Sequence, residues 1–145
     1  MSRVVYIALL VAGCGHPSPP TRQAGTAAPP DAAVAPLPLD RDLPRLAERA
    51  SKLYADLAAA FASAGEDCTA AIARLAELRG SYADVIAATA QVLHDGRAAD
   101  LEAALAAHED ARSASAKAIV ESKTMAACAK DRAFTQAYDE LVTPP

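Results

Sequence analysis

Residues 43–64 read LPRLAERASKLYADLAAAFASA, and this stretch decides the fold. Asp40 or Asp42 stands before it as a candidate helix cap. Pro44 is tolerated in a first helical turn, and Gly65 follows the last residue. The apolar positions recur at steps of three and four residues, the spacing of one helix face; they are Leu43, Leu46, Ala50, Leu53, Leu57, Phe61 and Ala64. A single stripe of this kind predicts a helix that packs against a partner helix.

The chain that follows has the composition of a helical domain. After Pro44 there is no proline until Pro144, and the only glycines in this interval are Gly65, Gly80 and Gly96. Because glycine and proline are the residues that most often end helices, this spacing predicts long helices. A second helix is expected over residues 67–94, with a bend at residues 80–81. Its expected buried positions are Cys68, Ile72, Leu75, Tyr82, Ile86 and Leu93.

Two more helices are expected after Gly96. The third begins near residues 98–100 with Leu101 and Leu105, and its middle is weakly apolar. That middle contains His108, Arg112 and Ser115, before Ile119. The fourth carries Cys128, Phe134, Tyr138 and Leu141. Weak apolarity in the third helix, together with small alanines throughout, can leave a pocket between the helices.

The alternative to separate third and fourth helices is one long helix over residues 97–142. No glycine or proline separates the two halves, so a three-helix variant is possible. Such a helix, running back along the second one, draws level with residue 68 near residue 123 and leaves its last apolar side chains without a partner. A turn near residues 122–124 folds those side chains inward instead. We therefore expect an all-α domain, an up-down four-helix bundle over residues 40–142.

The cysteines test this topology. The chain has three, Cys14, Cys68 and Cys128. In the four-helix bundle the second and fourth helices start at the same end, which brings Cys68 and Cys128 together. In an oxidising compartment we expect a disulfide between them, and its loop of about 60 residues would stabilise the fold by about 4 kcal/mol. The alternative is two buried, reduced cysteines.

The first residues have the layout of a secretion signal. One positive charge, Arg3, precedes an apolar run over residues 4–12, which has the length of a signal-peptide core and is too short to span a membrane. Residues 11–14, Val-Ala-Gly-Cys, resemble the lipobox of bacterial lipoproteins, although one charge makes a thin n-region. The resemblance implies removal of residues 1–13 and attachment of lipid to the thiolate of Cys14. The alternative is an ordinary signal or a disordered cytosolic end with an incidental cysteine.

The same resemblance implies a place in the cell envelope, lipid-anchored and facing the periplasm or the surface. Gly15 stands where an aspartate would retain an enterobacterial lipoprotein at the inner membrane, so the outer membrane is favoured. Seven of the ten prolines lie between Pro17 and Pro38, and such a segment predicts an extended tether. The expected organisation is a signal (1–13), a lipidated cysteine with a disordered linker (14–39), a helical domain (40–142) and a tail (143–145).

The sequence contains no recognised catalytic or metal-binding motif. His108 has no second histidine at i+4, and the covalent haem motif Cys-x-x-Cys-His is missing. His94, His108 and Met125 are the available side chains for a b-type haem. A net charge of −4, with both signs interleaved, argues against a nucleic-acid partner. We therefore predict no catalytic residue, no metal ligand, no cofactor and no enzyme activity.

These patterns predict a membrane-anchored envelope lipoprotein of unassigned role. Its helical domain is expected to contact an envelope protein partner without catalysing a reaction. The alternative is a periplasmic helical bundle that binds a small apolar ligand or haem.

Overall fold

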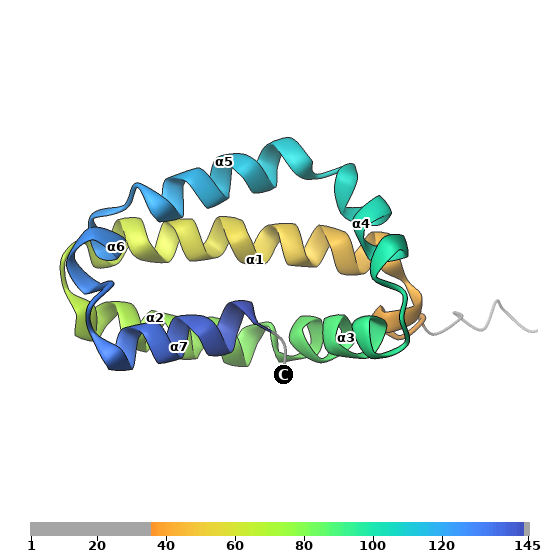
Figure 1. The fold of residues 1–145 in the computed structure, drawn as a ribbon, viewed down its shortest axis with the longest axis horizontal. Coiled ribbons are helices and arrows are strands. Elements are labelled where there is room, and N and C mark those ends of the chain that lie inside the picture. Colours follow the sequence, from red (N-terminus) through yellow and green to blue (C-terminus); the bar gives the residue numbers. More distant parts are fainter. Residues whose placement is uncertain (1–35, 144–145) are drawn as a thin grey trace, which may run out of the picture. The chain divides into compact units, whose positions relative to one another are not determined.

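The computed structural model describes residues 36–143, which belong to one compact unit (Figure 1). The predicted signal segment, Cys14 and the linker up to residue 35 lie outside the described residues, as do residues 144–145 of the predicted tail. The described chain is entirely helical apart from its turns. A short 3-10 turn, η1 (Leu39–Arg41), is followed by α1 (Leu43–Ala64), α2 (Cys68–Ser81), α3 (Ala83–His94), α4 (Ala98–Ala106), α5 (Glu109–Val120), α6 (Lys123–Cys128) and α7 (Arg132–Val142).

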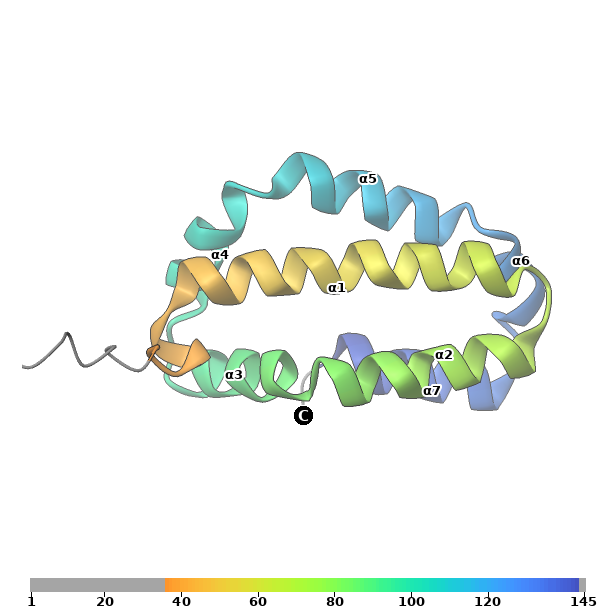
Figure 2. The same ribbon diagram turned by 180° about the vertical axis from the view of Figure 1, so that it is seen from behind.

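The path of the chain confirms the predicted all-α fold. Figures 1 and 2 show α1 running the length of the domain, α2 and α3 returning beside it, and α4 and α5 running forward again. After α6, α7 runs back beside α2. The turn expected near residues 122–124 is present, because Ser122 caps α6 by accepting a hydrogen bond from the backbone N–H of Met125. One long helix over residues 97–142 is therefore wrong.

The first helix begins and ends where the sequence predicts. The Asp42 side chain accepts a hydrogen bond from the Arg45 backbone N–H, and Pro44 lies in the first turn of α1. Gly65 follows the helix with a φ of 60°, a left-handed conformation that glycine adopts without steric cost. α1 buries Leu46, Ala47, Leu53, Leu57 and Phe61.

Each of the three later helices is broken once. The first break falls directly after the bend predicted at residues 80–81, whereas the other two were not predicted. α2 ends at Ser81, directly after Gly80, and α3 starts after Tyr82. The break between α4 and α5 falls at residues 107–108, in the weakly apolar middle of the predicted third helix. Between α6 and α7, the Asp131 carboxylate accepts hydrogen bonds from two backbone N–H groups, which starts a new helix there.

The break at Tyr82 changes which side chains α3 buries. The predicted positions were Ile86 and Leu93, but the helix instead buries Val85, Ala88 and Val92. Leu93 is 44% exposed and Ile86 only partly buried. Since a single helical register was carried through residues 67–94, the interruption at Tyr82 shifts the apolar stripe of α3 by one residue.

An aromatic cluster lies between α1 and α7. The ring of Phe61 lies 5.5 Å from that of Phe134 and 6.1 Å from that of Tyr138, measured between centroids. Phe61 and Phe134 are fully buried. Thr124 of α6, also fully buried, donates its hydroxyl to the carbonyl oxygens of Phe61 and Gly65, at 2.8 and 2.6 Å. These contacts attach α6 and α7 to the carboxyl end of α1.

The same end of the domain holds the disulfide. Cys68 is the first residue of α2 and Cys128 the last of α6, with their Cα atoms 5.5 Å apart. The pairing agrees with the one that the topology predicts, although Cys128 ends a short helix instead of beginning a long one. Cys128 is fully buried, and Cys68 is partly buried.

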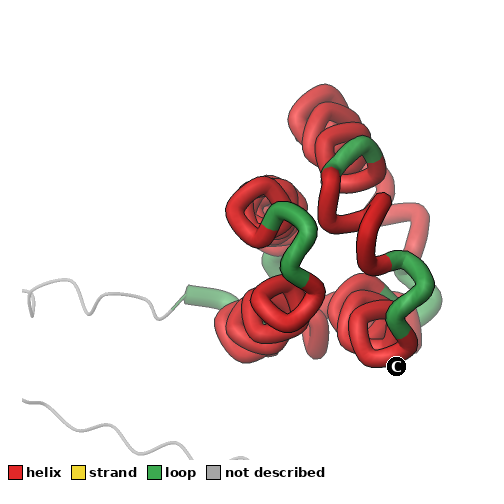
Figure 3. The backbone as a smooth tube through the Cα atoms, turned by 90° about the vertical axis from the view of Figure 1, so that its left-hand side faces the viewer, coloured by secondary structure: helices red, strands yellow, loops and turns green. Residues whose placement is uncertain are grey.

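The outer helices of the bundle pack against different partners. α5 packs against α1, and α7 packs against α2, while α1 and α2 pack against each other. In the end-on view of Figure 3, α5 lies beside α1 and α7 lies beside α2, and α5 and α7 are apart from each other. α7 ends at Val142, so this last helix covers only the α2 part of the returning α2–α3 segment. The part of the interior that lies beside α3 is therefore enclosed by fewer helices.

Candidate functional site

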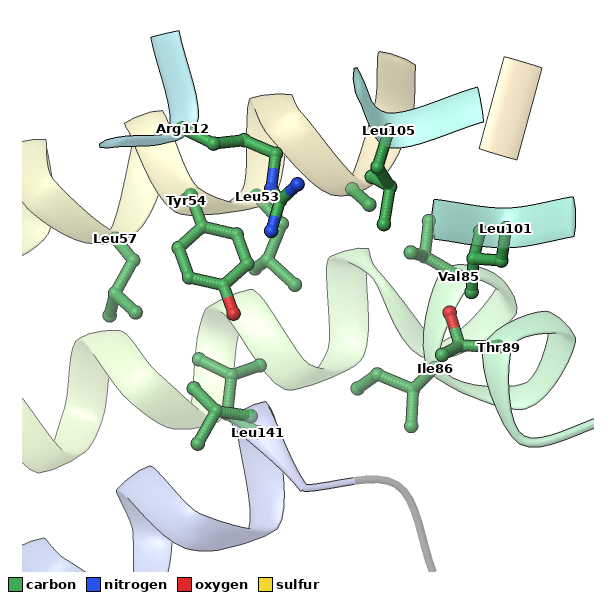
Figure 4. A pocket seen from close by; sticks show the side chains of 12 residues that line it. Leu53, Tyr54, Leu57, Val85, Ile86, Thr89, Leu101, Leu105, Arg112 and Leu141 are labelled. Carbon is green, nitrogen blue, oxygen red and sulfur yellow. The ribbon is translucent and has the colours of Figure 1, made fainter. Parts of the chain in front are cut away.

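A pocket of about 140 Å³ lies beside the carboxyl end of α7. It is bounded by α1, α3, α4, α5 and the last turn of α7 (Figure 4). The predicted third helix supplies one side of it, which is where the sequence predicts a pocket. The volume is close to that of the engineered protein cavity of about 150 Å³ that holds benzene.

Nine of the twelve lining residues are aliphatic. They are Ala50, Leu53, Leu57, Val85, Ile86, Leu101, Leu105, Leu141 and Val142. The other three are Tyr54, Thr89 and Arg112. A mostly apolar wall with a few polar groups is typical of sites that bind small molecules.

Arg112 is the only charged residue in the lining. Its guanidinium carbon lies 6.0 Å from the centre of the Tyr54 ring, within the range of a cation–π contact. One terminal nitrogen, Nη1, lies 3.2 Å from Oε2 of Glu109 one turn earlier on α5. The Arg112 side chain is 27% exposed, whereas that of Glu109 is 61% exposed. Figure 4 shows the guanidinium directed toward the Tyr54 ring and the pocket interior.

The pocket wall also contains two hydroxyl groups. Tyr54 and Thr89 are each half-buried in the pocket wall, from α1 and α3 respectively. Neither hydroxyl makes a hydrogen bond to another of residues 36–143. Both can therefore donate to, or accept from, a molecule in the pocket.

A polar cluster on the surface holds Tyr82 at the break between α2 and α3. The Tyr82 hydroxyl donates to Oδ2 of Asp56 at 2.5 Å, and Lys52 Nζ donates to the same carboxylate at 2.9 Å. The Arg49 guanidinium lies 5.7 Å from the centre of the Tyr82 ring and donates to Asp84 at 3.0 Å. These contacts link α1 to the start of α3, which carries part of the pocket wall.

The contacts in this cluster shift the pKa values of Asp56 and Tyr82. The Tyr82 hydroxyl and then the Lys52 ammonium donate to Asp56, which lowers the pKa of that carboxyl. Burial, followed by the hydrogen bond to Asp56, raises the pKa of Tyr82. Because the folded-state pKa of Asp56 lies below its unfolded value, its contribution to stability is present above the unfolded pKa. That contribution is lost as the pH falls through the folded-state pKa.

Replacing Tyr82 with phenylalanine tests this coupling. We expect the pKa of Asp56 to rise toward its ordinary value of about 3.9, because its strongest donor is gone. The free energy of unfolding at pH 7 should fall by about 1 kcal/mol, a value reduced for the partial exposure of Asp56. The measurements are NMR titration of the carboxyl and urea denaturation at pH 7 and pH 3. The loss should be smaller at pH 3. Tyr54→Phe is the matched control, and an equal shift of the Asp56 pKa in that variant would contradict the assignment.

The residues singled out in the sequence for haem ligation are not gathered at the pocket. The His94 side chain is 84% exposed, near Asp95. His108 lies at the break before α5, and Met125 packs against the hydrophobic core. Cys68 and Cys128 are joined at the end of the domain where α6 lies, and Cys14 is outside the described residues.

Sequence reasoning did not identify the polar residues of the pocket. Arg112 attracted notice only because it weakens the apolar pattern of the third helix. Tyr54 lies next to Leu53, just beside the predicted stripe of α1, and Thr89 lies on α3, whose register was shifted. The signal that could have found the site is an arginine at a helical spacing from Leu105 and Ile119, where a continuous apolar face would carry an aliphatic residue.

Searches over the described residues found neither a metal cluster nor a membrane span. No group of three or more histidine, cysteine, aspartate or glutamate side chains within residues 36–143 is arranged to hold a metal ion. In the same part of the chain, no helix has the length and apolar character needed to cross a membrane.

Comparison with known proteins does not assign a ligand to the pocket. No protein-family model, no curated protein and no solved structure matches this chain. The chemistry of the pocket therefore has to be inferred from its own residues.

Proposed function

We propose that the chain is an envelope lipoprotein that acts by binding. Lipid on Cys14 holds it at the membrane, and its helical domain contacts an envelope protein in the periplasm or at the cell surface without catalysing a reaction. The observation that carries this proposal is the order of segments. A lipobox-like stretch comes first, a proline-rich stretch follows, and a disulfide-closed helical domain begins at Leu39.

The length of the proline-rich stretch supports a tethered domain. Leu39 lies 25 residues after Cys14, from the difference between the two positions. A chain of this length spans about 25 Å as a flexible coil and about 75 Å as an extended polyproline helix. The domain can therefore reach a partner that lies well away from the lipid surface.

Substitution of Cys14 by serine in the native host tests the anchor. We expect the unsubstituted chain in the outer-membrane fraction, and we expect the Cys14→Ser chain to be absent from that fraction and to carry neither acyl mass nor a cleaved signal, because both steps require the thiol. Crosslinking in intact cells should capture one specific envelope protein with the unsubstituted chain. Equal distribution of both chains would overturn the anchor, and the absence of a specific crosslink together with an unchanged envelope on deletion would overturn the protein-contact role.

A second function is favoured by the pocket. Its volume of about 140 Å³ and its aliphatic lining fit a small apolar ligand. A haem macrocycle is several times larger than the benzene-sized group that this volume holds, so of the two ligands the pocket favours the small apolar one. The small ligand is compatible with the envelope location, since both proposals use the same tethered domain.

A further inference from the structure

The pocket combines an apolar interior with a single cationic group at its edge. Leucines from three helices, including Leu53, Leu105 and Leu141, form the interior. Arg112 supplies the positive charge, and no acidic residue is among the twelve that line the pocket. A ligand that matches both features has an apolar body and a negatively charged end.

The geometry of Arg112 favours a carboxylate as that end. A guanidinium presents five N–H donors in a planar fork that fits the two oxygens of a carboxylate. Only Nη1 of Arg112 contacts Glu109, at 3.2 Å, so Nη2 and Nε are left to a ligand among the described contacts. The Tyr54 ring lies beside the guanidinium, with its centre 6.0 Å from the guanidinium carbon, and its hydroxyl reaches further into the pocket (Figure 4).

The size of the pocket limits the apolar body. A volume of about 140 Å³ is close to that of the cavity that encloses benzene, which corresponds to about six carbon atoms. Larger bodies would have to extend beyond this volume. A chain or ring of about six carbons is therefore the size that the pocket encloses.

We propose that the pocket binds a small monocarboxylate with an apolar body of about six carbons, whose carboxylate pairs with Arg112. This inference rests on the second proposed function, that the pocket takes a small ligand. Glu109 competes for the guanidinium from the solvent side, so it weakens the affinity for the anion.

Calorimetric titration of the full chain carrying Cys14→Ser, which cannot take an acyl chain at residue 14, tests the proposal. The probes are hexanoate and 1-hexanol at pH 7, which have six carbon atoms each, one of them the carboxyl carbon in hexanoate, and differ in charge. Hexanoate is expected to bind about tenfold more tightly than 1-hexanol, because a hydrogen-bonded charge pair of this kind is worth about that factor. Ala50→Leu places three more carbon atoms in the pocket, and it should weaken the binding of both probes strongly.

Variants of Arg112 and Glu109 separate the effect of charge on binding from the effect of the apolar cavity. Arg112→Gln should weaken hexanoate about tenfold and leave 1-hexanol unchanged, whereas Glu109→Gln should strengthen hexanoate about threefold. The matched control is Arg74→Gln on α2, since Arg74 has a similar pair with Glu77 at 2.7 Å and is absent from the pocket lining. Thermal unfolding of each variant shows whether it is folded, and Arg112→Lys provides a second test in which the charge remains without the planar fork.

The outcomes distinguish the inference from the function on which it rests. Equal binding of the two probes, unaffected by Arg112→Gln, would overturn the carboxylate inference and leave the small-ligand proposal standing. Binding of neither probe to the folded chain would overturn both. Weaker binding of hexanoate in Arg74→Gln, to the same extent as in Arg112→Gln, would show a general charge effect and would also overturn the inference.

Discussion

Replacing both Cys68 and Cys128 with alanine is expected to lower the free energy of unfolding by about 4 kcal/mol. The disulfide closes a loop with a sequence separation of 60 residues, which restricts the unfolded chain. The loss is a large fraction of the stability of a small domain, commonly about 5–15 kcal/mol. Six of the thirty residues of the hydrophobic core are alanines, and each of these buries little apolar area.

Urea denaturation of the Cys14→Ser chain measures this effect. The double alanine variant and the parent in reductant should both unfold at clearly lower urea than the oxidised parent. Reductant leaves the sulfur atoms in place, so it separates the crosslink from the small cavity that alanine leaves at the buried Cys128. Identical denaturation midpoints with and without reductant would contradict a stabilising Cys68–Cys128 bond.

Truncation of Phe61 to alanine is expected to destabilise the fold by about 3–5 kcal/mol. Phe61 is fully buried and lies between α1 and α7, in contact with the rings of Phe134 and Tyr138. Its removal leaves a cavity at the point where α7 attaches to α1. The short α7 otherwise packs mainly against α2. The loss therefore combines the transfer free energy of the ring with the free-energy cost of the cavity.

The matched control is Leu93→Ala, on α3. Leu93 is a large apolar side chain that is 44% exposed, so its truncation should change stability by no more than about 0.5 kcal/mol. Thermal and urea denaturation of the two variants, side by side, measure the difference. Equal losses in both variants would contradict the assignment of Phe61 to the core and of Leu93 to the surface.

The overall path of the chain was predictable, because it depends on signals that a sequence displays directly. Asp42 and Gly65 mark the ends of α1, and Gly96 marks the turn before α4. Their conformational preferences act locally and need no knowledge of tertiary contacts. The proximity of Cys68 and Cys128 then followed from the order of the helices.

The helix breaks and their consequences were not predictable in the same way. Asp131 acts as a cap only because the chain turns there, and the sequence around it also permits a continuous helix. The break at Tyr82 shifts the buried face of α3 from Ile86 and Leu93 to Val85 and Val92. An amphipathic pattern read through a break keeps the wrong register, so errors accumulate after each one.

From the sequence, the candidate site could be predicted only as a region where the helices do not fill the interior. The poor apolar pattern around Arg112 indicates that the third helix cannot fill its share of the interior. The identity of the lining depends on where α7 ends and on which face α3 presents, and both are decided by tertiary contacts. The convergence of Tyr54, Thr89 and Arg112 on one cavity therefore required the structure.

Intact mass spectrometry of the protein purified from membranes of its native host tests the central claim most directly. The claim is that a lipid-anchored cysteine carries a disulfide-closed helical domain. We expect a mass that begins at Cys14 with added acyl chains, and two thiols that are alkylated only after reduction. A full-length chain that begins at Met1, with free thiols at Cys68 and Cys128, would contradict both the anchor and the crosslink.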